Sequence, residues 1–153
     1  MSEQPGRPAG AADPADPTDS QRYERGMAVR RAVLGDEHVD RSTAAATDFT
    51  RPWQEFITRT AWGDVWTRPG LTRRERSIAV LSSLIAHGHH EEFQMHVRAA
   101  LRNGLTRDEI AEVILQSAIY SGVPAANTAY RLAQQVFDRL DENEGDGAKE
   151  ARE

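Results

Sequence analysis

The sequence predicts an all-α protein, and three observations support this prediction. Apolar residues recur at intervals of three and four positions, as at Ile78, Leu81 and Ile85, which is the spacing of one helix face. Two capping boxes, 72–75 and 106–109, are typical of helix starts. No segment shows the regular alternation of apolar and polar residues that would indicate a convincing strand.

Composition limits the possible functions. A chain of 153 residues with 39% hydrophobic residues is the size of one domain and can bury a core. It has no cysteine, which excludes disulfides, zinc–thiolate sites, iron–sulfur clusters and thiol nucleophiles. The net charge of −5 argues against a nucleic-acid-binding protein. Neither an apolar run of about 18 residues nor a secretory signal pattern is present, so we expect a cytoplasmic protein without a membrane partner.

The two ends of the chain differ from its middle. Residues 1–20 contain four prolines and no large apolar residue beyond Met1, so they cannot bury enough surface to offset the entropy lost on ordering. The polar segment 141–153 has the same character. We therefore expect a disordered arm over 1–20, a folded domain over 21–140 and a disordered tail over 141–153.

The first half of this domain predicts two helices and a less regular segment. A helix is expected over 21–34, ended by Gly35. A second is expected over 44–59, which Pro52 would either start or interrupt. The segment 62–70 has the composition of a loop or a short helix.

The second half predicts longer helices. The first begins at the capping box of Thr72, and Gly88 favours a break, so that a new helix would run to Asn103. The segment 109–120 is apolar almost all round, which is typical of a central helix or a subunit interface. A last helix is expected to begin at Pro124, a residue suited to a first helical turn.

The main candidate for a site is a cluster of His89, Glu92 and His96, which would share one face of a helix beside an apolar stripe. Such surroundings shift pKa values and suit acid–base chemistry. The alternatives are an imidazole that only packs against a neighbouring carboxylate, and a metal site. The metal motif HExxH is absent, because His90 and Glu91 are not followed by a histidine at Gln94.

Aromatic residues and serines give weaker signals. Trp53, Trp62 and Trp66 could wall a ligand pocket, although anchoring a core or an interface is the commoner role. No serine lies in a G-x-S-x-G elbow, and no glycine-rich phosphate loop follows a strand.

Four stretches together carry a family resemblance: 22–41, 62–71, 91–100 and 116–127. They resemble the carboxymuconolactone decarboxylase family, which is part of the alkylhydroperoxidase D-like superfamily. The resemblance covers about residues 21–140. It implies an alkylhydroperoxidase D-like fold of about six helices, assembled as a homotrimer or homohexamer with sites near the subunit contacts.

The wider superfamily includes peroxidases with a C-x-x-C pair ahead of a histidine. The corresponding positions here hold His89 and Glu92, with His96 as the matching histidine. The acidic residue that those peroxidases carry twelve positions earlier corresponds to Ser77. Thiol redox chemistry is therefore excluded, while acid–base groups occupy the same helix face.

The resemblance implies cofactor-free decarboxylation of 4-carboxymuconolactone to 3-oxoadipate enol-lactone, a step of protocatechuate breakdown in the β-ketoadipate pathway. The ring alkene and lactone carbonyl of this substrate can accept the electrons that CO2 leaves behind, so no cofactor is needed. The expected ligand is thus a dicarboxylate lactone. A related lactone or keto-acid decarboxylase, a metal-dependent hydrolase and a non-enzymatic small-molecule-binding protein stay open as alternatives.

Side-chain chemistry then assigns provisional roles. His96 would donate the proton or stabilise the enolate, Glu92 would set its tautomer or share its proton, and His89 would be a second donor. An arginine would hold the spectator carboxylate, and aromatic residues would shape the pocket. The candidate arginines are Arg30, Arg31 and Arg98, and the candidate aromatic residues are Trp62, Trp66 and Tyr120.

Overall fold

The computed structural model describes residues 17–150, and every regular element in that range is helical. The prediction of an all-α fold is therefore confirmed. Of the arm expected over 1–20, residues 1–16 lie outside the described residues, as do residues 151–153, whereas residues 19–20 belong to the first helix, which begins two residues earlier than expected. In chain order the elements are α1 (Asp19–Leu34), α2 (Asp36–Ala44), α3 (Arg51–Ile57), the π-helix η1 (Thr58–Val65), α4 (Arg73–His87), α5 (His90–Arg102), α6 (Arg107–Ser121) and α7 (Val123–Glu150).

Local sequence signals set several helix ends as predicted. The hydroxyls of Thr72 and Thr106 accept hydrogen bonds from the backbone N–H groups of Glu75 and Glu109, and the glutamate side chains reach back to the threonine N–H groups. Gly88 ends α4 in the left-handed conformation, at φ 69°.

The structure differs from the sequence analysis at three further places. The helix expected over 44–59 begins only at Arg51, with Pro52 in its first turn. Before it, the hydroxyls of Thr47 and Thr50 bond to the turn backbone and compete with helix formation. The sequence analysis missed α2, and α7 runs on to Glu150 beyond the domain end expected at residue 140.

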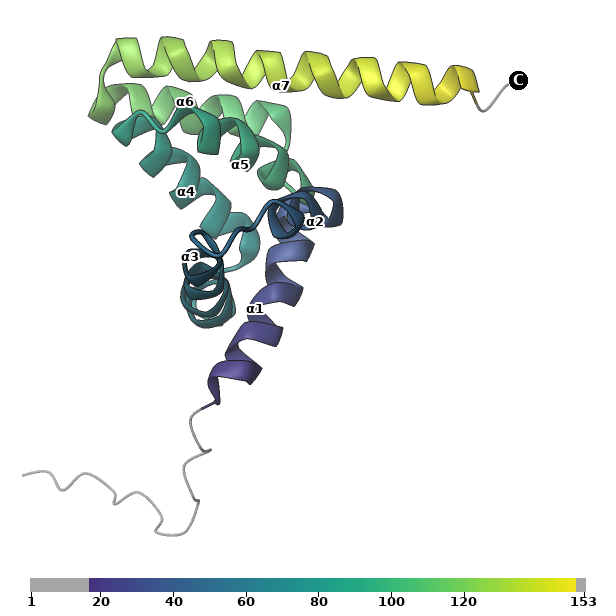
Figure 1. Ribbon diagram of the computed structural model, residues 1–153. Helices are drawn as coiled ribbons and strands as arrows, with labels where there is room; N and C mark the ends of the chain where they lie inside the picture. Colours follow the sequence, from purple (N-terminus) through teal and green to yellow (C-terminus); the bar gives the residue numbers. More distant parts are fainter. Residues whose placement is uncertain (1–16, 151–153) are drawn as a thin grey trace, which may run out of the picture.

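The C-terminal half is a bundle of α4, α5, α6 and α7 around an apolar core. Figure 1 shows α7 lying along α5 and α6, with α4 beneath them. Leu81, Phe93, Ile110, Ile114 and Val136 are almost completely buried in this core. Burial of these side chains is the main term that holds the bundle together.

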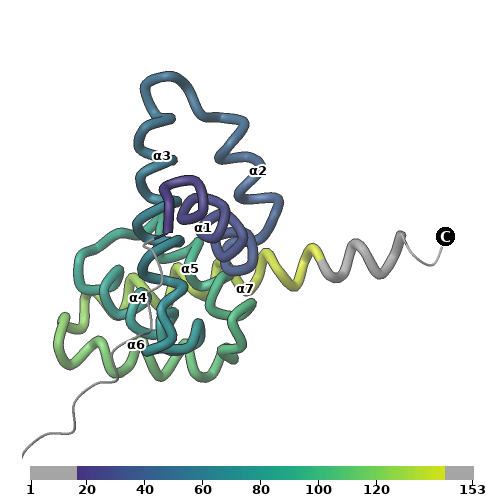
Figure 2. The backbone as a smooth tube through the Cα atoms, turned by 90° about the horizontal axis from the view of Figure 1, so that it is seen from below, coloured from purple at the N-terminus to yellow at the C-terminus, as the bar shows by residue number. Residues whose placement is uncertain are grey.

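The N-terminal half packs on one side of this bundle. Figure 2 shows α2 and α3 together on one side of the molecule, with α6 on the other. Here α1 packs chiefly against η1, and two glycines permit the close approach. A Cβ atom at Gly26 would lie 2.0 Å from the carbonyl oxygen of Thr58, and one at Gly63 would lie 2.4 Å from that of Arg22.

A second apolar cluster joins the two halves. Val33, Val39 and Trp62 are buried together with Ala99 of α5. This cluster fixes α5 against α1, α2 and η1, so that one face of α5 looks into the bundle and another toward the N-terminal half. Within residues 17–150, none of the helices combines the length and apolar character needed to cross a membrane.

Candidate functional site

His96 lies on the face of α5 that looks toward the N-terminal half. Its ring packs against Trp66, with 6.5 Å between the ring centroids and 19° between the planes. Trp66 in turn contacts Trp62, at a centroid distance of 5.1 Å. Trp66 is the C-cap of η1, so the end of the π-helix places this indole beside the imidazole, with Trp62 behind it.

The surroundings of His96 keep its imidazole neutral. The pKa of His96 is lowered from 6.5 to about 4, chiefly by burial and also by the nearby charge of His38, while the charge of Glu92 acts in the opposite direction. The Nδ1 atom of His96 is buried and has no hydrogen-bond partner within the described part of the chain. A neutral, partly unsatisfied imidazole against an aromatic wall can donate a hydrogen bond to an oxygen that gains negative charge.

The other two members of the predicted cluster lie differently. Glu92 is exposed, although its charge reaches His96. His89 is also exposed, and its ring stacks on His87 at a centroid distance of 5.9 Å. The expectation that all three share one helix face fails for His89, because it is the N-cap of α5, with φ −82° and ψ 80°, and helical spacing does not extend to it.

The three candidate arginines have very different environments. Arg30 on α1 is 5% exposed. It donates hydrogen bonds to Thr58 Oγ1 at 3.2 Å and to Gln54 Oε1 at 2.9 Å. Its Nε atom is buried without a partner, and burial lowers the pKa of the guanidinium. Arg31, the next residue, forms ion pairs with Asp36 at 3.1 Å and Asp40 at 2.6 Å, so its charge is already matched.

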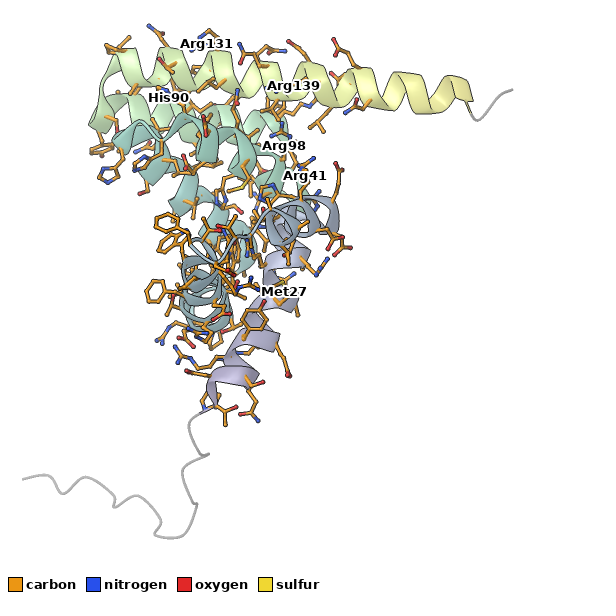
Figure 3. The ribbon with its side chains drawn as sticks, viewed as in Figure 1. Met27, Arg41, His90, Arg98, Arg131 and Arg139 are labelled. Atoms are coloured by element: carbon orange, nitrogen blue, oxygen red, sulfur yellow. The ribbon has the colours of Figure 1, made fainter. Side chains whose placement is uncertain are left out.

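Arg98 lies in a wide groove instead. It is half-buried and donates to the carbonyl of Gln94 at 3.2 Å, and burial together with nearby arginines lowers its pKa. The groove has a volume of about 590 Å³ and also contains Arg41, Glu91 and Arg102. Figure 3 shows Arg41 and Arg98 near the junction of α2, α5 and α7.

His38 is a second imidazole near His96 that sequence reasoning missed. It lies on α2, and its charge acts on His96. Burial and the charges of four arginines, with Arg30 the strongest, lower the pKa of His38 itself. It fell within one of the stretches that carry the family resemblance, but no helical spacing relates it to His96. Only the packing of α2 on α5 brings the two imidazoles near each other.

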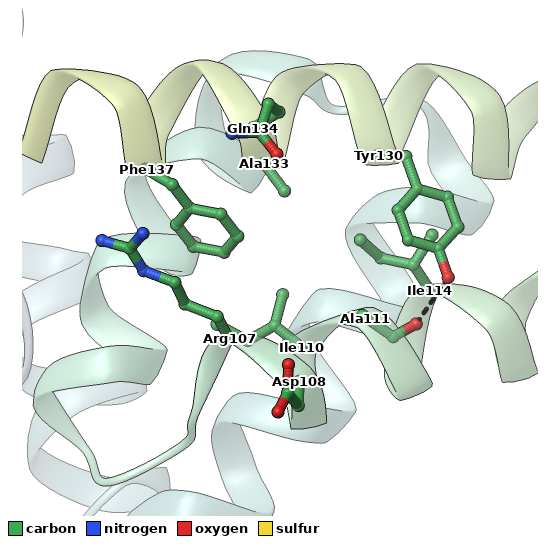
Figure 4. A pocket seen from close by; sticks show the side chains of 9 residues that line it. All are labelled: Arg107, Asp108, Ile110, Ala111, Ile114, Tyr130, Ala133, Gln134 and Phe137. Atoms are coloured by element: carbon green, nitrogen blue, oxygen red, sulfur yellow. Dashed lines mark hydrogen bonds between the residues drawn. The ribbon is translucent and has the colours of Figure 1, made fainter. Parts of the chain in front are cut away.

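Tyr120 does not join this site within a single chain. Its side chain is 81% exposed at the C-terminal end of α6. Another hollow, between α6 and α7, contains none of the predicted site residues. Figure 4 shows its apolar walls, with the Tyr130 hydroxyl donating to the carbonyl of Ala111 at 2.9 Å. This second hollow has no imidazole and is a less suitable place for proton transfer.

A metal site finds no support in side-chain placement. Across the described range, no three histidine, aspartate or glutamate side chains are grouped so that they could hold a metal ion. The metal-dependent hydrolase alternative therefore has no donor set in residues 17–150.

Comparisons with known proteins agree with the resemblance seen in the sequence. The family model described as "Carboxymuconolactone decarboxylase family" matches residues 51–135. A 4-carboxymuconolactone decarboxylase of Acinetobacter baylyi is 48% identical over 80% of this chain and 91% of its own length. A nitrosuccinic acid decarboxylase of Metarhizium robertsii is 42% identical over 80% of this chain and 86% of its own. A 4-carboxymuconolactone decarboxylase of Pseudomonas putida is 59% identical over 30% of this chain and 96% of its own.

Proposed function

Because this chain belongs to the carboxymuconolactone decarboxylase family, we propose that it converts 4-carboxymuconolactone to 3-oxoadipate enol-lactone and CO2. The observation that carries this proposal is the neutral, half-buried imidazole of His96, which lies against Trp66 and has a buried, unpaired Nδ1. The Acinetobacter baylyi relative, which aligns over 91% of its own length, supports the choice of substrate.

The proposed reaction needs no cofactor, because the substrate itself can accept the electron pair. The bond between the ring carbon and its carboxylate breaks, and CO2 leaves. The electron pair of that bond enters the conjugated ring and is delocalised onto the carbonyl oxygen of the lactone, which gives a dienolate. A proton is then added to the carbon next to the carbonyl, which moves the double bond and gives the enol-lactone. The protein must stabilise the dienolate oxygen and deliver this one proton.

His96 is the proposed group for both tasks. In the free protein it is neutral at pH 7, because the pKa is lowered to about 4. The N–H group of a neutral imidazole can donate a hydrogen bond to the developing oxyanion. A bound dianion would also favour the charged imidazolium and raise this pKa again, which would let His96 deliver the proton.

The remaining predicted residues have supporting roles in this proposal. Trp66, which lies against His96, and Trp62 behind it would provide an apolar surface beside the reacting ring. Glu92, at the exposed edge, tunes His96 through its charge, so Glu92→Gln is expected to lower turnover less than a change at His96. His89 and Tyr120 are exposed in one chain and contribute only where a second subunit covers them.

A homotrimer or homohexamer in the cytoplasm is part of the same proposal. Large apolar side chains lie exposed near both ends of the fold. Trp53 and Phe56 on α3 stack at a centroid distance of 5.9 Å, and Ile119 lies beside Tyr120 on α6. Patches of this kind mark association surfaces. Light scattering coupled to size-exclusion chromatography measures the assembly, and a monomer at micromolar concentration would contradict this part.

A second candidate is a decarboxylase of another acid with two carboxylates. It is favoured by the Metarhizium robertsii relative, named for nitrosuccinic acid. In nitrosuccinic acid one carboxylate can leave as CO2 and the other stays. The nitro group can accept the electron pair of the broken bond. The same site would serve, with a different electron acceptor beside His96.

A direct assay separates these functions. Freshly prepared 4-carboxymuconolactone is mixed with the purified protein, and loss of the conjugated lactone is followed by ultraviolet absorbance, with and without a metal chelator. The proposal predicts turnover that the chelator does not change. Turnover of nitrosuccinate but not of the lactone would favour the second candidate. Absence of turnover with either acid at micromolar protein would reject the enzyme proposal.

A further inference from the structure

We propose that Arg30 and the hollow beside it form a binding site for one carboxylate group, and that this site holds the carboxylate that stays on the substrate. The second half of this statement rests on the proposed decarboxylation. The first half concerns binding alone and can be tested without turnover.

The burial of Arg30 is the first argument. A charged group in the interior is costly unless an opposite charge pairs with it. Arg30 is 5% exposed, yet no aspartate or glutamate of the described residues forms an ion pair with it. Its two hydrogen-bond partners, Thr58 and Gln54, are neutral, and its buried Nε has none. The guanidinium therefore keeps both its charge and part of its donor capacity for a ligand.

The hollow is the second argument. It has a volume of about 170 Å³, and Tyr23, Met27, Gln54 and Thr58 line it together with Arg30. This is smaller than a typical pocket for a whole ligand but sufficient for an acetate arm. The other charges at this hollow are matched, since Glu55 pairs with Arg59 at 3.7 Å and Arg51 with Asp48 at 2.9 Å. Arg30 is left as its unmatched charge.

The position of the hollow is the third argument. Met27 lines it and also packs against the cluster of Trp62 and Trp66, whose indoles lead to His96. The charge of Arg30 also acts on His38, and the charge of His38 acts on His96. The hollow and His96 are therefore related through the side chains packed between them and through these charges, and we place the rest of the ligand on the side of the hollow that faces His96.

The other two candidate arginines suit this role less well. Arg31 is engaged by Asp36 and Asp40. Arg98 has no ion pair among the residues described, but it lies half-buried in the wide groove, where Glu91 is also present. A carboxylate there would stay hydrated and would bind less tightly.

Gln54→Glu is the most informative variant, because it places an internal carboxylate on the Arg30 fork, 2.9 Å from Nη2 in the present geometry. We expect it to raise the melting temperature, since a buried charge gains its partner. We expect it to weaken succinate binding, measured by titration calorimetry on the full chain, by about tenfold or more, and to raise KM for the lactone similarly.

Arg30→Lys keeps the positive charge but loses the paired N–H donors of the guanidinium, so it should weaken succinate binding as well. Arg131→Gln, at an exposed position on α7, is the matched control without effect.

Several outcomes would overturn the site. One is a Gln54→Glu or Arg30→Lys protein that folds and binds succinate as the wild type does. Another is loss of succinate binding in Arg98→Gln but not in Arg30→Lys. A third is a wild-type chain that binds no succinate at millimolar concentration. Succinate bound through Arg30 without lactone turnover would reject the proposed decarboxylation and leave the carboxylate site standing. Turnover with an unchanged KM in Gln54→Glu would reject the carboxylate site and leave the proposed decarboxylation standing.

Discussion

The C-terminal bundle and the N-terminal half of this molecule treat buried polar groups in opposite ways. In the bundle, Ser77 accepts a hydrogen bond from Asn103 at 2.9 Å, and Ser117 donates to the carbonyl of Val113 at 2.7 Å. Where the N-terminal half meets α5, Arg30 has no counter-charge and the Nδ1 of His96 has no hydrogen-bond partner among residues 17–150. Arg76 on α4 also has a buried, unpaired Nε, but its Nη2 donates to the carbonyl of Arg68 at 2.9 Å.

This difference separates stability from function. Polar groups that are fully satisfied serve the fold, whereas buried groups left without partners carry a free-energy cost that a ligand can remove. In the proposed account the bundle is the rigid support, and the junction between α1, α2, η1 and α5 is the proposed site. Changes in the bundle should lower stability, and changes at the junction should alter binding, catalysis or pH dependence.

The largest effect on stability is expected in the bundle. Phe93 is 1% exposed in its core, so Phe93→Ala should lower the free energy of unfolding by about 3–5 kcal/mol. Phe49 is 93% exposed, and Phe49→Ala should change it by less than about 0.5 kcal/mol. Urea unfolding followed by circular dichroism measures both. Equal losses in the two variants would contradict the assignment of the bundle as the stabilising region.

A second test concerns the pH dependence of stability. Because the pKa of His96 is lowered from 6.5 to about 4, the unfolded chain binds a proton at this residue more readily than the folded chain between these two values. The free energy of unfolding should therefore fall as pH drops from 6.5 toward 4, by at most about 3 kcal/mol from this group.

His96→Gln isolates this contribution, since glutamine does not titrate. Its stability should fall less than that of the wild type over the same pH interval, when urea unfolding is repeated at several pH values. Parallel curves for the two proteins would mean that His96 is not buried in its neutral form.

The variant with the smallest predicted loss of stability tests the seam between α1 and η1, which is the close contact of these two helices at Gly26. Gly26→Ala would place a Cβ atom 2.0 Å from the carbonyl oxygen of Thr58, so the two helices must move apart. We expect a loss of about 1–3 kcal/mol in the free energy of unfolding, together with weaker succinate binding as Thr58 shifts away from Arg30. At Gly70 an added Cβ has no atom within 4 Å, so Gly70→Ala is the control. A Gly26→Ala protein as stable as this control would show that the seam is adaptable.

Local signals explain what the sequence could predict. The capping boxes at Thr72 and Thr106 and the stop at Gly88 act within a few residues, so each could be read directly from the sequence. The choice of His96 rested on its helical spacing from Glu92 and His89 and on its place in the pattern shared with the thiol peroxidases. Its position against Trp66 is a property of packing.

Long-range packing explains what could not be predicted. His38 approaches His96 only because α2 folds back after Gly35, which has φ 90°. Arg30 was one of three equivalent arginines in the sequence, and only its burial against Thr58 and Gln54 distinguishes it. Helical periodicity also misled at His89, which lies just before the helix whose spacing was applied to it.

The most direct test of the central claim is the turnover number of His96→Gln with 4-carboxymuconolactone, measured beside the wild type under saturating substrate. If the buried imidazole stabilises the dienolate and delivers the proton, kcat should fall by about a hundredfold or more while circular dichroism shows an intact helical fold. A folded His96→Gln protein that turns over the lactone at close to the wild-type rate would contradict the account.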